Sequence, residues 1–399
     1  MPATHSRIRL LLILGALAAF GPLATDMYLP SFPALARAFS TDAAAVQGTL
    51  ATYFVGLAIG QAVWGPISDR YGRRGPLLFG IALFSAASAS CALTSSIETL
   101  WLARFAQALG GSVGMVLGRA AVRDVYAGAD AAHFYSRLLI VLGMAPIVAP
   151  FFGGQVLASF GWRAIFWALG LFGVGCFLAV WLQLPETLPG ARRADGGLRT
   201  VLRGYGRFLR DRRFLGFTLP SNLAFAGMFA YIAGSPFVFI ELYGVSPQQF
   251  GLLFGFNAIG IVVSSQINAW LVHRVGPARL LRVAFLVYFA AAIALLVAAL
   301  TKAGLVAIAA PLFFAVATMG VVPPNSMALA LEPHPRAAGS ASALMGAMQF
   351  SVGAPVVALL GVLHDGSALP MAMIVLGCAL VALAINLAPA AARRGAGRG

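Results

Sequence analysis

Twelve apolar runs, separated by short charged or turn-rich breaks, are the feature that most limits what this chain can form. A helix needs about 20 apolar residues to cross the hydrocarbon layer of a membrane. Only 10% of the 399 residues are charged, whereas a soluble domain carries about a quarter, so most of the surface must face lipid. The sequence therefore predicts an all-α integral membrane protein. The expected spans are residues 8–30, 44–66, 75–94, 98–119, 133–157, 162–184, 214–240, 248–272, 279–300, 305–330, 337–362 and 369–388.

Basic residues mark one side of the predicted membrane. If the N-terminus is cytoplasmic, all but four of the 27 basic residues fall in loops or termini on the cytoplasmic side. Arg37, Arg163 and Lys302 would lie outside, and Arg104 would lie within a span. Cytoplasmic loops are enriched in Lys and Arg, so this bias supports twelve spans and predicts that both termini are cytoplasmic.

The longest polar segment divides the chain into two sets of six spans. It covers residues 185–213 and separates residues 1–184 from residues 214–399. Part of it, LRTVLRGYGRFLRD, alternates apolar and basic residues at roughly helical spacing, which fits an amphipathic helix on the membrane surface. A basic cytoplasmic linker explains most of the same composition, and we favour that interpretation.

Several functional classes are disfavoured by where the polar residues fall. The net charge of +15 comes from short clusters between spans, so it does not indicate a nucleic-acid surface. The three cysteines lie inside apolar runs and the five histidines at segment ends, so neither a disulfide framework nor a metal site is expected. An enzyme would need a nucleophile, metal ligands or paired carboxylates at a cavity. We therefore expect neither an enzyme nor a cofactor.

A weak internal repeat links the two halves. GPISDRYGRRGPLL begins at Gly65, and AWLVHRVGPARLL begins 204 residues later, so that Arg70 corresponds to Arg274 and Gly72 to Gly276. Both copies fall between the second and third spans of their half. Many transporters are built from such repeats, with the substrate site between them near the midplane of the bilayer.

The first copy, G-x-x-x-D-R-x-G-R-R at 65–74, resembles the signature loop of the major facilitator superfamily. LARFAQALGG (102–111), GMAPIVAPFFGG (143–154) and LPETLP (184–189) resemble motifs of its fourth, fifth and sixth helices. Together with TDMYLPSFP (25–33), the set is similar to the Bcr/CflA group of drug:proton antiporters. The resemblance implies twelve helices in two pseudo-symmetric six-helix halves, in the inner membrane of a bacterium, and a monomer.

The resemblance also implies that six residues gate the transporter: Gly65, Asp69, Arg70, Gly72, Arg73 and Asp124. Asp69 would accept hydrogen bonds from the amides that begin the span near 336–346. Arg73 would pair with Asp124 at the cytoplasmic end of the fourth span. These contacts would lock the outward-facing state, and ordinary ion pairs within the loop are the alternative.

The fifth span carries two prolines four residues apart, followed by paired glycines. Each proline removes a backbone donor and kinks the helix, and small residues let a neighbouring helix approach closely. The family resemblance implies that this bent helix seals the interface between the halves and limits proton leak, although Ala149 stands where the usual motif has glycine. The motif residues are Gly143, Pro146, Pro150, Gly153 and Gly154.

Asp26 is the only carboxylate that lies clearly inside a span. It lies roughly 24 Å above Leu10 at helical rise, between Pro22 and Pro30. An embedded ionisable group is functional by default, and burial disfavours the charged form of a carboxylate. Asp26 is therefore predicted to exchange a proton or a cationic substrate. The alternative is that the span ends near residue 25, with Asp26 as its cap and a periplasmic stretch after it.

Arg104 is a cation about one and a half turns into the fourth span. Such a residue should face the bundle interior, and Gln107 at i+3 extends the same polar face. Snorkelling to the outer interface is the alternative. For the substrate cavity the sequence predicts Asp26, Tyr53, Arg104, Gln107, Asn222 and Tyr231, while other embedded amides, Asn257 among them, are equally well explained by helix packing.

The predicted function is proton-coupled efflux of amphipathic drugs or antibiotics by alternating access. An uncharged pocket with aromatic residues and scattered amides suits such substrates, and the expected partners are a lipophilic small molecule, membrane lipid and protons. A proton-coupled exporter or importer of one small metabolite is the alternative. A receptor or scaffold with twelve spans would have no reason to keep an embedded acid.

Overall fold

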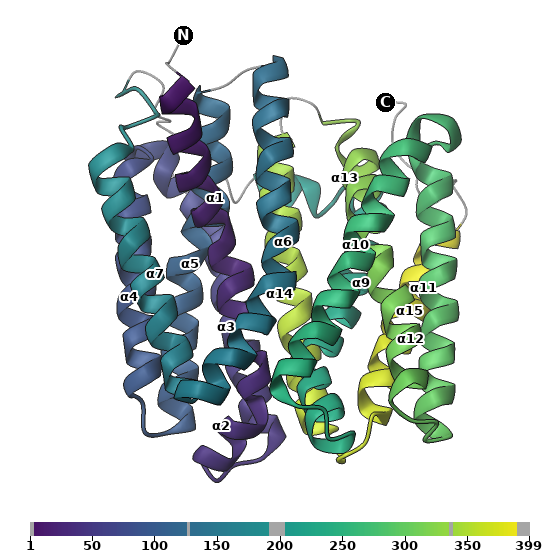
Figure 1. Ribbon diagram of the computed structural model, residues 1–399. Helices are drawn as coiled ribbons and strands as arrows, with labels where there is room; N and C mark the ends of the chain where they lie inside the picture. Colours follow the sequence, from purple (N-terminus) through teal and green to yellow (C-terminus); the bar gives the residue numbers. More distant parts are fainter. Residues whose placement is uncertain (1–3, 126–127, 191–203, 335–337, 389–399) are drawn as a thin grey trace.

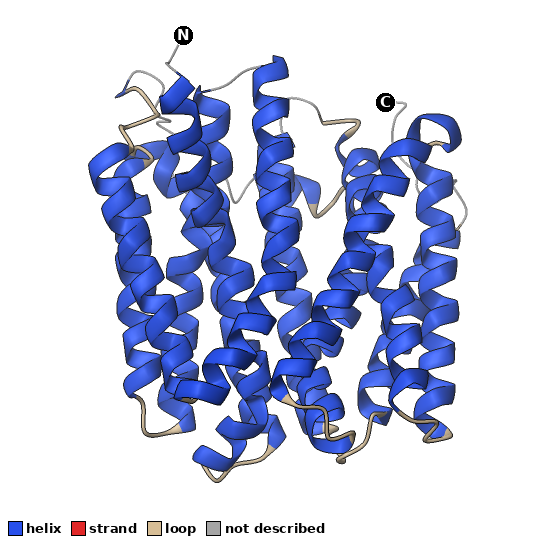
Figure 2. Cartoon of the chain, in the orientation of Figure 1, coloured by secondary structure: helices blue, strands red, loops and turns tan. Residues whose placement is uncertain are grey.

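The computed structural model of the chain describes residues 4–125, 128–190, 204–334 and 338–388, and the regular secondary structure of these residues is entirely helical (Figure 2). Within these residues, twelve segments are long and apolar enough to cross a membrane. They coincide with the twelve predicted spans to within a few residues, except that the first continues to Ala38, the second continues to Tyr71, and the fifth is Gly143–Phe160 where 133–157 was predicted. The all-α membrane fold is therefore confirmed.

The first six spans run from purple to teal in Figure 1. They are built from α1 (Thr4–Asp26), η1 (Leu29–Ser31), α2 (Phe32–Ala38), α3 (Ala43–Tyr71), α4 (Arg74–Leu93), α5 (Ile97–Val125), α6 (Gly128–Phe160) and α7 (Trp162–Gln183). The first span is thus a broken one, made of α1, η1 and α2 in succession.

The last six spans run from teal to yellow. They are built from α9 (Arg212–Pro236), η3 (Phe237–Leu242), α10 (Pro247–Val275), α11 (Pro277–Leu300), α12 (Leu305–Ala317), η4 (Thr318–Gly320), α13 (Val322–Leu331), α14 (Ala338–Val362) and α15 (Leu369–Leu387). The tenth span is also broken, at η4, directly before the proline pair that opens α13.

The two copies of the repeat end their helices in the same way. Gly72 ends α3 with φ 95°, and Gly276 ends α10 with φ 84°. Each amide donates to the carbonyl four residues earlier, at 3.0 Å in both cases. Only glycine adopts this left-handed conformation without a steric penalty, so the spacing seen in the sequence reflects a shared turn.

The halves meet mainly along two pairs of helices. α3 packs against α14, and α6 packs against α10; these are the most extensive contacts between the two sets of spans, and both pairs lie at the centre of Figure 1. We call the end of the bundle where α1 begins and α15 ends the terminal end, and the opposite end the far end. At the far end, η1 and α2 also contact α9, η3 and α10, so the halves are closed together there.

A short helix at residues 204–208 precedes the second half. Its Tyr205 and Phe208 are buried against Phe214 of α9, Ala330 of α13 and Leu344 of α14. This part of the predicted linker is therefore helical and packs on the protein. Residues 198–203, the first part of the segment LRTVLRGYGRFLRD for which an amphipathic helix was considered, lie outside the described part of the chain.

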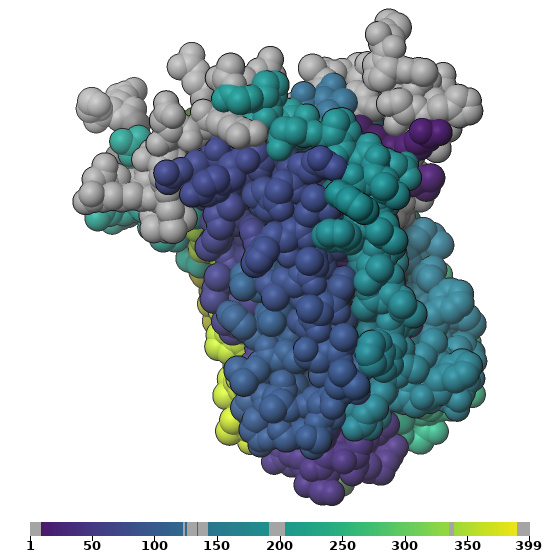
Figure 3. All heavy atoms as spheres, turned by 90° about the vertical axis from the view of Figure 1, so that its left-hand side faces the viewer, coloured from purple at the N-terminus to yellow at the C-terminus, as the bar shows by residue number. Residues whose placement is uncertain are grey.

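The outer surface of the bundle is apolar. Figure 3 looks onto the face made by α4, α5 and α7, with α2 at its far end. Phe79, Leu102, Leu171 and Trp181 are exposed on these helices. A surface of large exposed apolar side chains is stable in hydrocarbon and not in water, as expected for a chain embedded in a membrane.

Candidate functional site

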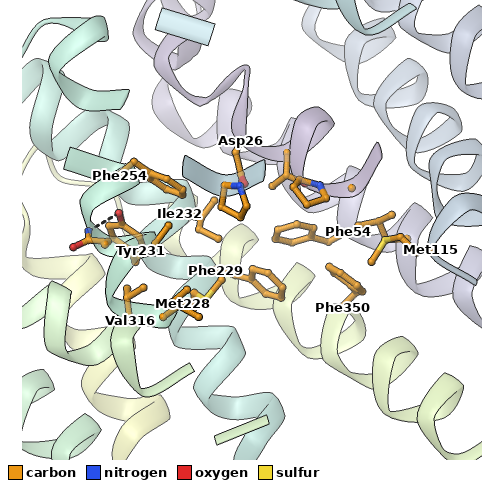
Figure 4. A pocket seen from close by; sticks show the side chains of 18 residues that line it. Asp26, Phe54, Met115, Met228, Phe229, Tyr231, Ile232, Phe254, Val316 and Phe350 are labelled. Atoms are coloured by element: carbon orange, nitrogen blue, oxygen red, sulfur yellow. Dashed lines mark hydrogen bonds between the residues drawn. The ribbon is translucent and has the colours of Figure 1, made fainter. Parts of the chain in front are cut away.

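A cavity of about 180 Å³ lies between the two halves. Its walls come from α1, α3, α5 and α6 on one side and from α9, α10, α12 and α14 on the other (Figure 4). The lining is predominantly apolar, with Asp26 as its charged member. The lining residues are Gly21, Pro22, Thr25, Asp26, Phe54, Leu57, Met115, Pro146, Met228, Phe229, Tyr231, Ile232, Phe254, Asn257, Ala258, Ile261, Val316 and Phe350.

Aromatic rings from both halves form two walls of this cavity. Phe54 of α3 contacts Phe229 of α9, with ring centroids 4.3 Å apart, and Phe229 stacks on Phe350 of α14 at 5.5 Å. Tyr231 stacks on Phe254 at 5.5 Å. Figure 4 shows the Phe54, Phe229 and Phe350 group beside Met115, and the Tyr231 and Phe254 pair on the other side of Asp26. Such surfaces accommodate flat or bulky apolar groups.

Asp26 is the last residue of α1, and the sequence explains why the helix ends there. In a continuing helix, the Asp26 carbonyl would accept a hydrogen bond from residue 30, but Pro30 has no N–H to donate. The Asp26 side chain is nonetheless buried, at 5% exposure. Among the described residues, its carboxylate makes no hydrogen bond or ion pair with another side chain.

The first span continues past Asp26 to Ala38, so Asp26 is embedded as predicted and the alternative that the span ends near residue 25 is wrong. Within this span, α1 itself stops at Asp26. The segment that follows, however, is not an exposed loop, because Tyr28, Leu29, Phe32 and Leu35 are fully buried in the bundle. Asp26 therefore lies at a break inside the protein core.

Arg104 of α5 is fully buried beside this break. Its guanidinium lies between the rings of Tyr28 and Tyr53, 4.1 Å from each centroid. It donates to the Ala24 carbonyl at 3.0 Å and also to the Gln107 side chain. The Ala24 carbonyl belongs to the last turn of α1, where carbonyls lack helical partners. Arg104 thus caps the C-terminal end of α1, and snorkelling to the interface is excluded.

Two of the six predicted cavity residues, Asp26 and Tyr231, line the cavity. The other four are buried nearby without lining it in this conformation: Tyr53, Arg104, Gln107 and Asn222. Arg104 turns toward α1 because a carbonyl at its broken end needs a donor, whereas Gln107 accepts from Arg104 and donates to the Ser88 hydroxyl of α4 at 2.7 Å. The role of these four in binding substrate stays a prediction.

Asn257 is a cavity residue that sequence reasoning did not single out. Its Nδ2 donates to the Tyr231 hydroxyl at 2.7 Å, which holds the two polar side chains of α9 and α10 together at the wall. In the sequence Asn257 is one of several embedded amides. Nothing in the apolar runs around it indicates which face of α10 meets α9.

The signature loop forms an ion-pair cluster at the terminal end. Arg73 donates to Asp124 of α5 at 2.9 Å and to Asp69 of α3 at 2.5 Å, so the predicted Arg73–Asp124 pair is confirmed. Burial would lower the pKa of the Arg73 guanidinium, but these hydrogen bonds raise it above its ordinary value. Glu186 accepts from the Arg73 amide at 2.8 Å and from the Arg74 amide at 3.3 Å, an N-terminal cap of α4 that the sequence did not reveal.

The remaining residues of the loop surround this cluster. Gly65 and Arg70 lie in the last two turns of α3, and Gly72 ends that helix. The start of the span that Asp69 was expected to cap, residues 335–337, lies outside the described chain. That contact, and the gating role of all six residues, stay predictions.

The glycines of the fifth-span motif lie where α6 meets two other segments. A β-carbon at Gly153 would lie 1.8 Å from the Met27 carbonyl oxygen, and one at Gly154 would lie 2.6 Å from the Pro247 carbonyl oxygen. Real β-carbons essentially never approach so closely. Glycine is therefore required for α6 to touch both the break after α1 and the start of α10.

The other motif residues lie on the same helix nearer the terminal end. A β-carbon at Gly143 would reach Val262 of α10 at 3.6 Å. Pro146 lines the central cavity and Pro150 is buried. α6 continues as one helix through both prolines. The motif thus lies at the interface between the halves, as the resemblance implied, while its effect on proton leak stays a prediction.

The chain is similar to transporters along most of its length. It matches the family model of the Major Facilitator Superfamily over residues 14–358. It is 40% identical to an uncharacterized MFS-type transporter, YdgK, of Bacillus subtilis, with 95% of each chain covered. It is 31% identical to a bicyclomycin resistance protein homolog of Haemophilus influenzae, with 94% of each covered. The fold matches the xylose transporter XylE from E. coli in a partially occluded inward-open conformation, with a TM-score of 0.76, 15% identity, and 97% and 98% of the two chains covered.

Proposed function

Because the chain belongs to the major facilitator superfamily and is a transporter of the Bcr/CflA type, we propose that it exports amphipathic drugs or antibiotics in exchange for protons. The observation that carries this proposal is the Asp26 carboxylate, which faces a largely apolar, aromatic cavity between the halves and has no charged partner among the described residues. The printed name of the H. influenzae relative, a bicyclomycin resistance protein homolog, supports the antibiotic substrate class.

The proposed cycle uses Asp26 as the single coupling group. When the cavity faces the proton-rich side, Asp26 takes up a proton, and the substrate, no longer held by a charge, leaves. When the cavity faces the cytoplasm, Asp26 loses the proton, and the carboxylate binds a cationic or polarised substrate whose apolar part packs on Phe54, Phe229 and Phe350. Competition between proton and substrate for one buried site links the two fluxes, because only one can occupy it at a time.

The proposal includes the setting in which this exchange takes place. The protein would act as a monomer in a bacterial inner membrane, with both termini cytoplasmic, surrounded by lipid and without an organic or metal cofactor. The predominantly apolar lining favours a lipophilic substrate over a single polar metabolite, because a polar metabolite would require several hydrogen-bonding partners in the wall. The gating cluster around Arg73 would stabilise one of the two states of the cycle.

The test uses inside-out membrane vesicles loaded with a pH-sensing dye. Once the vesicles are energised, structurally different antibiotics and lipophilic cations are added to wild-type, Asp26→Asn and Asp365→Asn proteins. We expect some compounds to release protons from wild-type vesicles and none to do so from Asp26→Asn vesicles. Asp365 lies in an exposed far-end loop, so Asp365→Asn is the matched control and should respond as the wild type does.

Two results would contradict the proposal in different ways. Proton release by the Asp26→Asn protein at the wild-type level would show that Asp26 is not the coupling group. No proton release by the wild-type protein with any compound would reject the drug substrate class, and a screen of polar metabolites would follow.

A further inference from the structure

A second, smaller cavity of about 10 Å³ adjoins the central one. The two share Met228, Tyr231 and Val316 as wall residues, and Figure 4 shows Met228 and Val316 next to each other below Tyr231. Beyond this shared wall, the small cavity reaches α11, where Tyr288 forms its end. It is therefore a side chamber of the central cavity that penetrates the second half of the protein.

The Tyr288 hydroxyl is buried in this chamber without a partner. The side chain is 2% exposed, and its hydroxyl makes no hydrogen bond to any described residue. Native proteins rarely leave such a group unsatisfied, and each case requires an explanation. The phenol reaches this position because Gly227 lies opposite: a β-carbon there would be 1.9 Å from the hydroxyl oxygen.

A resident water is a poor partner for this hydroxyl. The volume is about that of one water molecule, but a buried water needs two to four polar partners. The Tyr231 hydroxyl accepts from Asn257 at 2.7 Å and keeps its own O–H free to donate, so a water here would have no more than the minimum of two polar partners, Tyr231 and Tyr288. The other side chains around the chamber are aliphatic or thioether groups, such as Leu312, Met319 and Val375. The Tyr288 hydroxyl therefore borders a largely apolar space whose one other polar group is the Tyr231 hydroxyl, and a polar substituent that enters this space would supply the partner that Tyr288 lacks.

We propose that this chamber is a substrate subsite that receives a hydrogen-bonding substituent, such as a hydroxyl, at the end of an aromatic group, and that Tyr288 binds that substituent. The proposal rests on the proposed export of amphipathic compounds and adds a determinant of specificity to it. Met228 forms the partition between the chambers. Its unbranched thioether chain has three rotatable bonds, so a change of rotamer joins the two spaces into one elongated site.

The geometry gives Tyr288 a role distinct from that of Asp26. Asp26 selects for positive charge and couples substrate to protons, whereas Tyr288 selects for a polar group beyond the aromatic walls. A site that is built to hydrogen-bond a substrate hydroxyl discriminates against the analogue that lacks it, because the buried group of the protein then stays unpaired. The subsite therefore changes the choice among substrates without taking part in proton exchange.

The experiment measures binding to the purified full-length protein in detergent. The probes are phenylalkyl-trimethylammonium ions with two, three or four methylenes, each paired with its 4-hydroxyphenyl counterpart. We expect the wild type to bind the hydroxylated member of at least one pair about fivefold more tightly, the value of one net hydrogen bond. Tyr288→Phe should reduce this ratio to about one and leave the affinity for the unhydroxylated member unchanged.

Two further variants separate the subsite from a general effect on packing. Tyr243→Phe removes a hydroxyl from the same half but outside both cavities, so it should keep the wild-type ratio. Met228→Ile replaces the flexible partition by a β-branched side chain with a stiff χ1. This variant should reduce the affinity ratio within each pair to about one although Tyr288 is intact. A general packing defect would change the affinities for both members of a pair together and leave the ratio as in the wild type.

The outcomes distinguish the subsite from the proposed function. Equal affinities within every pair for the wild type, or an unchanged ratio in Tyr288→Phe, would overturn the subsite and leave drug export in place. If the wild type binds neither series, the proposed class of cationic amphipathic substrates is rejected, and the subsite is rejected with it.

Discussion

Arg104 supplies a hydrogen-bond donor that the broken first span requires. Ending α1 at Asp26 leaves carbonyl groups in its last turn without helical partners. Arg104 donates to one of them, on Ala24, and its charge is stabilised by the faces of Tyr28 and Tyr53. A planar guanidinium can stack and donate in fixed directions at the same time, which an ammonium group cannot do.

Arg104→Lys is therefore not expected to be a conservative change. Loss of the Ala24 hydrogen bond leaves a buried acceptor unpaired, which costs about 2 kcal/mol, and stacking between two rings is lost as well. We expect a lower Tm in detergent and reduced proton release in vesicles. The matched control is Arg163→Lys, because Arg163 also lies over a ring, that of Trp162, and donates to a carbonyl, but is exposed. A Tm equal to that of the wild type for Arg104→Lys would contradict the capping role.

At the scale of the helices, α6 uses two glycines to approach the backbone of other segments. Gly153 lets it contact the backbone of Met27, the residue directly after Asp26, and Gly154 lets it contact the start of α10. A helix that touches both halves this closely can control whether they separate at the far end. The glycines of this motif therefore matter because they let backbones come into close contact, and not because of any side-chain chemistry.

We predict that Gly153→Ala weakens the closed far end. The added methyl group cannot fit 1.8 Å from the Met27 oxygen, so α6 must move away from the break after α1, and antiport should fall at least about tenfold, as misplacement near a site by about 1 Å often causes. A cysteine at Gln47, whose side chain donates to the Ala233 carbonyl of the other half at 3.2 Å, should react faster with an impermeant thiol reagent. Gly175→Ala is the control, since a β-carbon there meets nothing within 4 Å; equal effects of the two substitutions would refute the packing argument.

At the scale of the whole molecule, the distribution of charge indicates how the protein is oriented in the membrane, and the closed far end indicates which side of the membrane the cavity is closed to. Arg70, Arg73, Arg74 and Arg274 lie at turns of the terminal end, whereas the described far-end loops carry few cations. The positive-inside rule then predicts that the terminal end is cytoplasmic. With the halves in contact at the far end, this structure would be one in which the periplasmic side is closed.

The orientation can be measured with two single cysteines in intact cells. Lys302 lies in the far-end loop between α11 and α12, and Arg279 lies near the terminal end of α11; both are exposed. Lys302→Cys should react with a membrane-impermeant maleimide added outside, and Arg279→Cys should react only after the membrane is permeabilised. The native Cys91, Cys176 and Cys378 are buried, so the unmodified chain is the blank. The reverse pattern would invert the proposed topology.

Features that depend on position along the chain follow from the amino-acid sequence alone. The length of each apolar run had to match the hydrocarbon thickness, so twelve spans could be counted and most of their ends placed to within a few residues. Pro30 has no N–H, so it had to interrupt the helical hydrogen bonds after Asp26. Asp26 itself could be identified as an acid embedded in the first span. The Arg73–Asp124 pair was implied by a family resemblance, because no local pattern connects residues 51 positions apart.

The faces along which the helices meet, and therefore the residues that form the site, are set by tertiary packing. A helix that is hydrophobic all round has no amphipathic stripe to show which side lies inward, so the sequence could not tell that Asn257 holds Tyr231 or that Tyr288 points into a chamber beside Met228. It also could not show that Arg104 turns away from the cavity to cap α1. That choice depends on where the broken helix end lies in space, and such a position is set by packing between segments far apart in the chain.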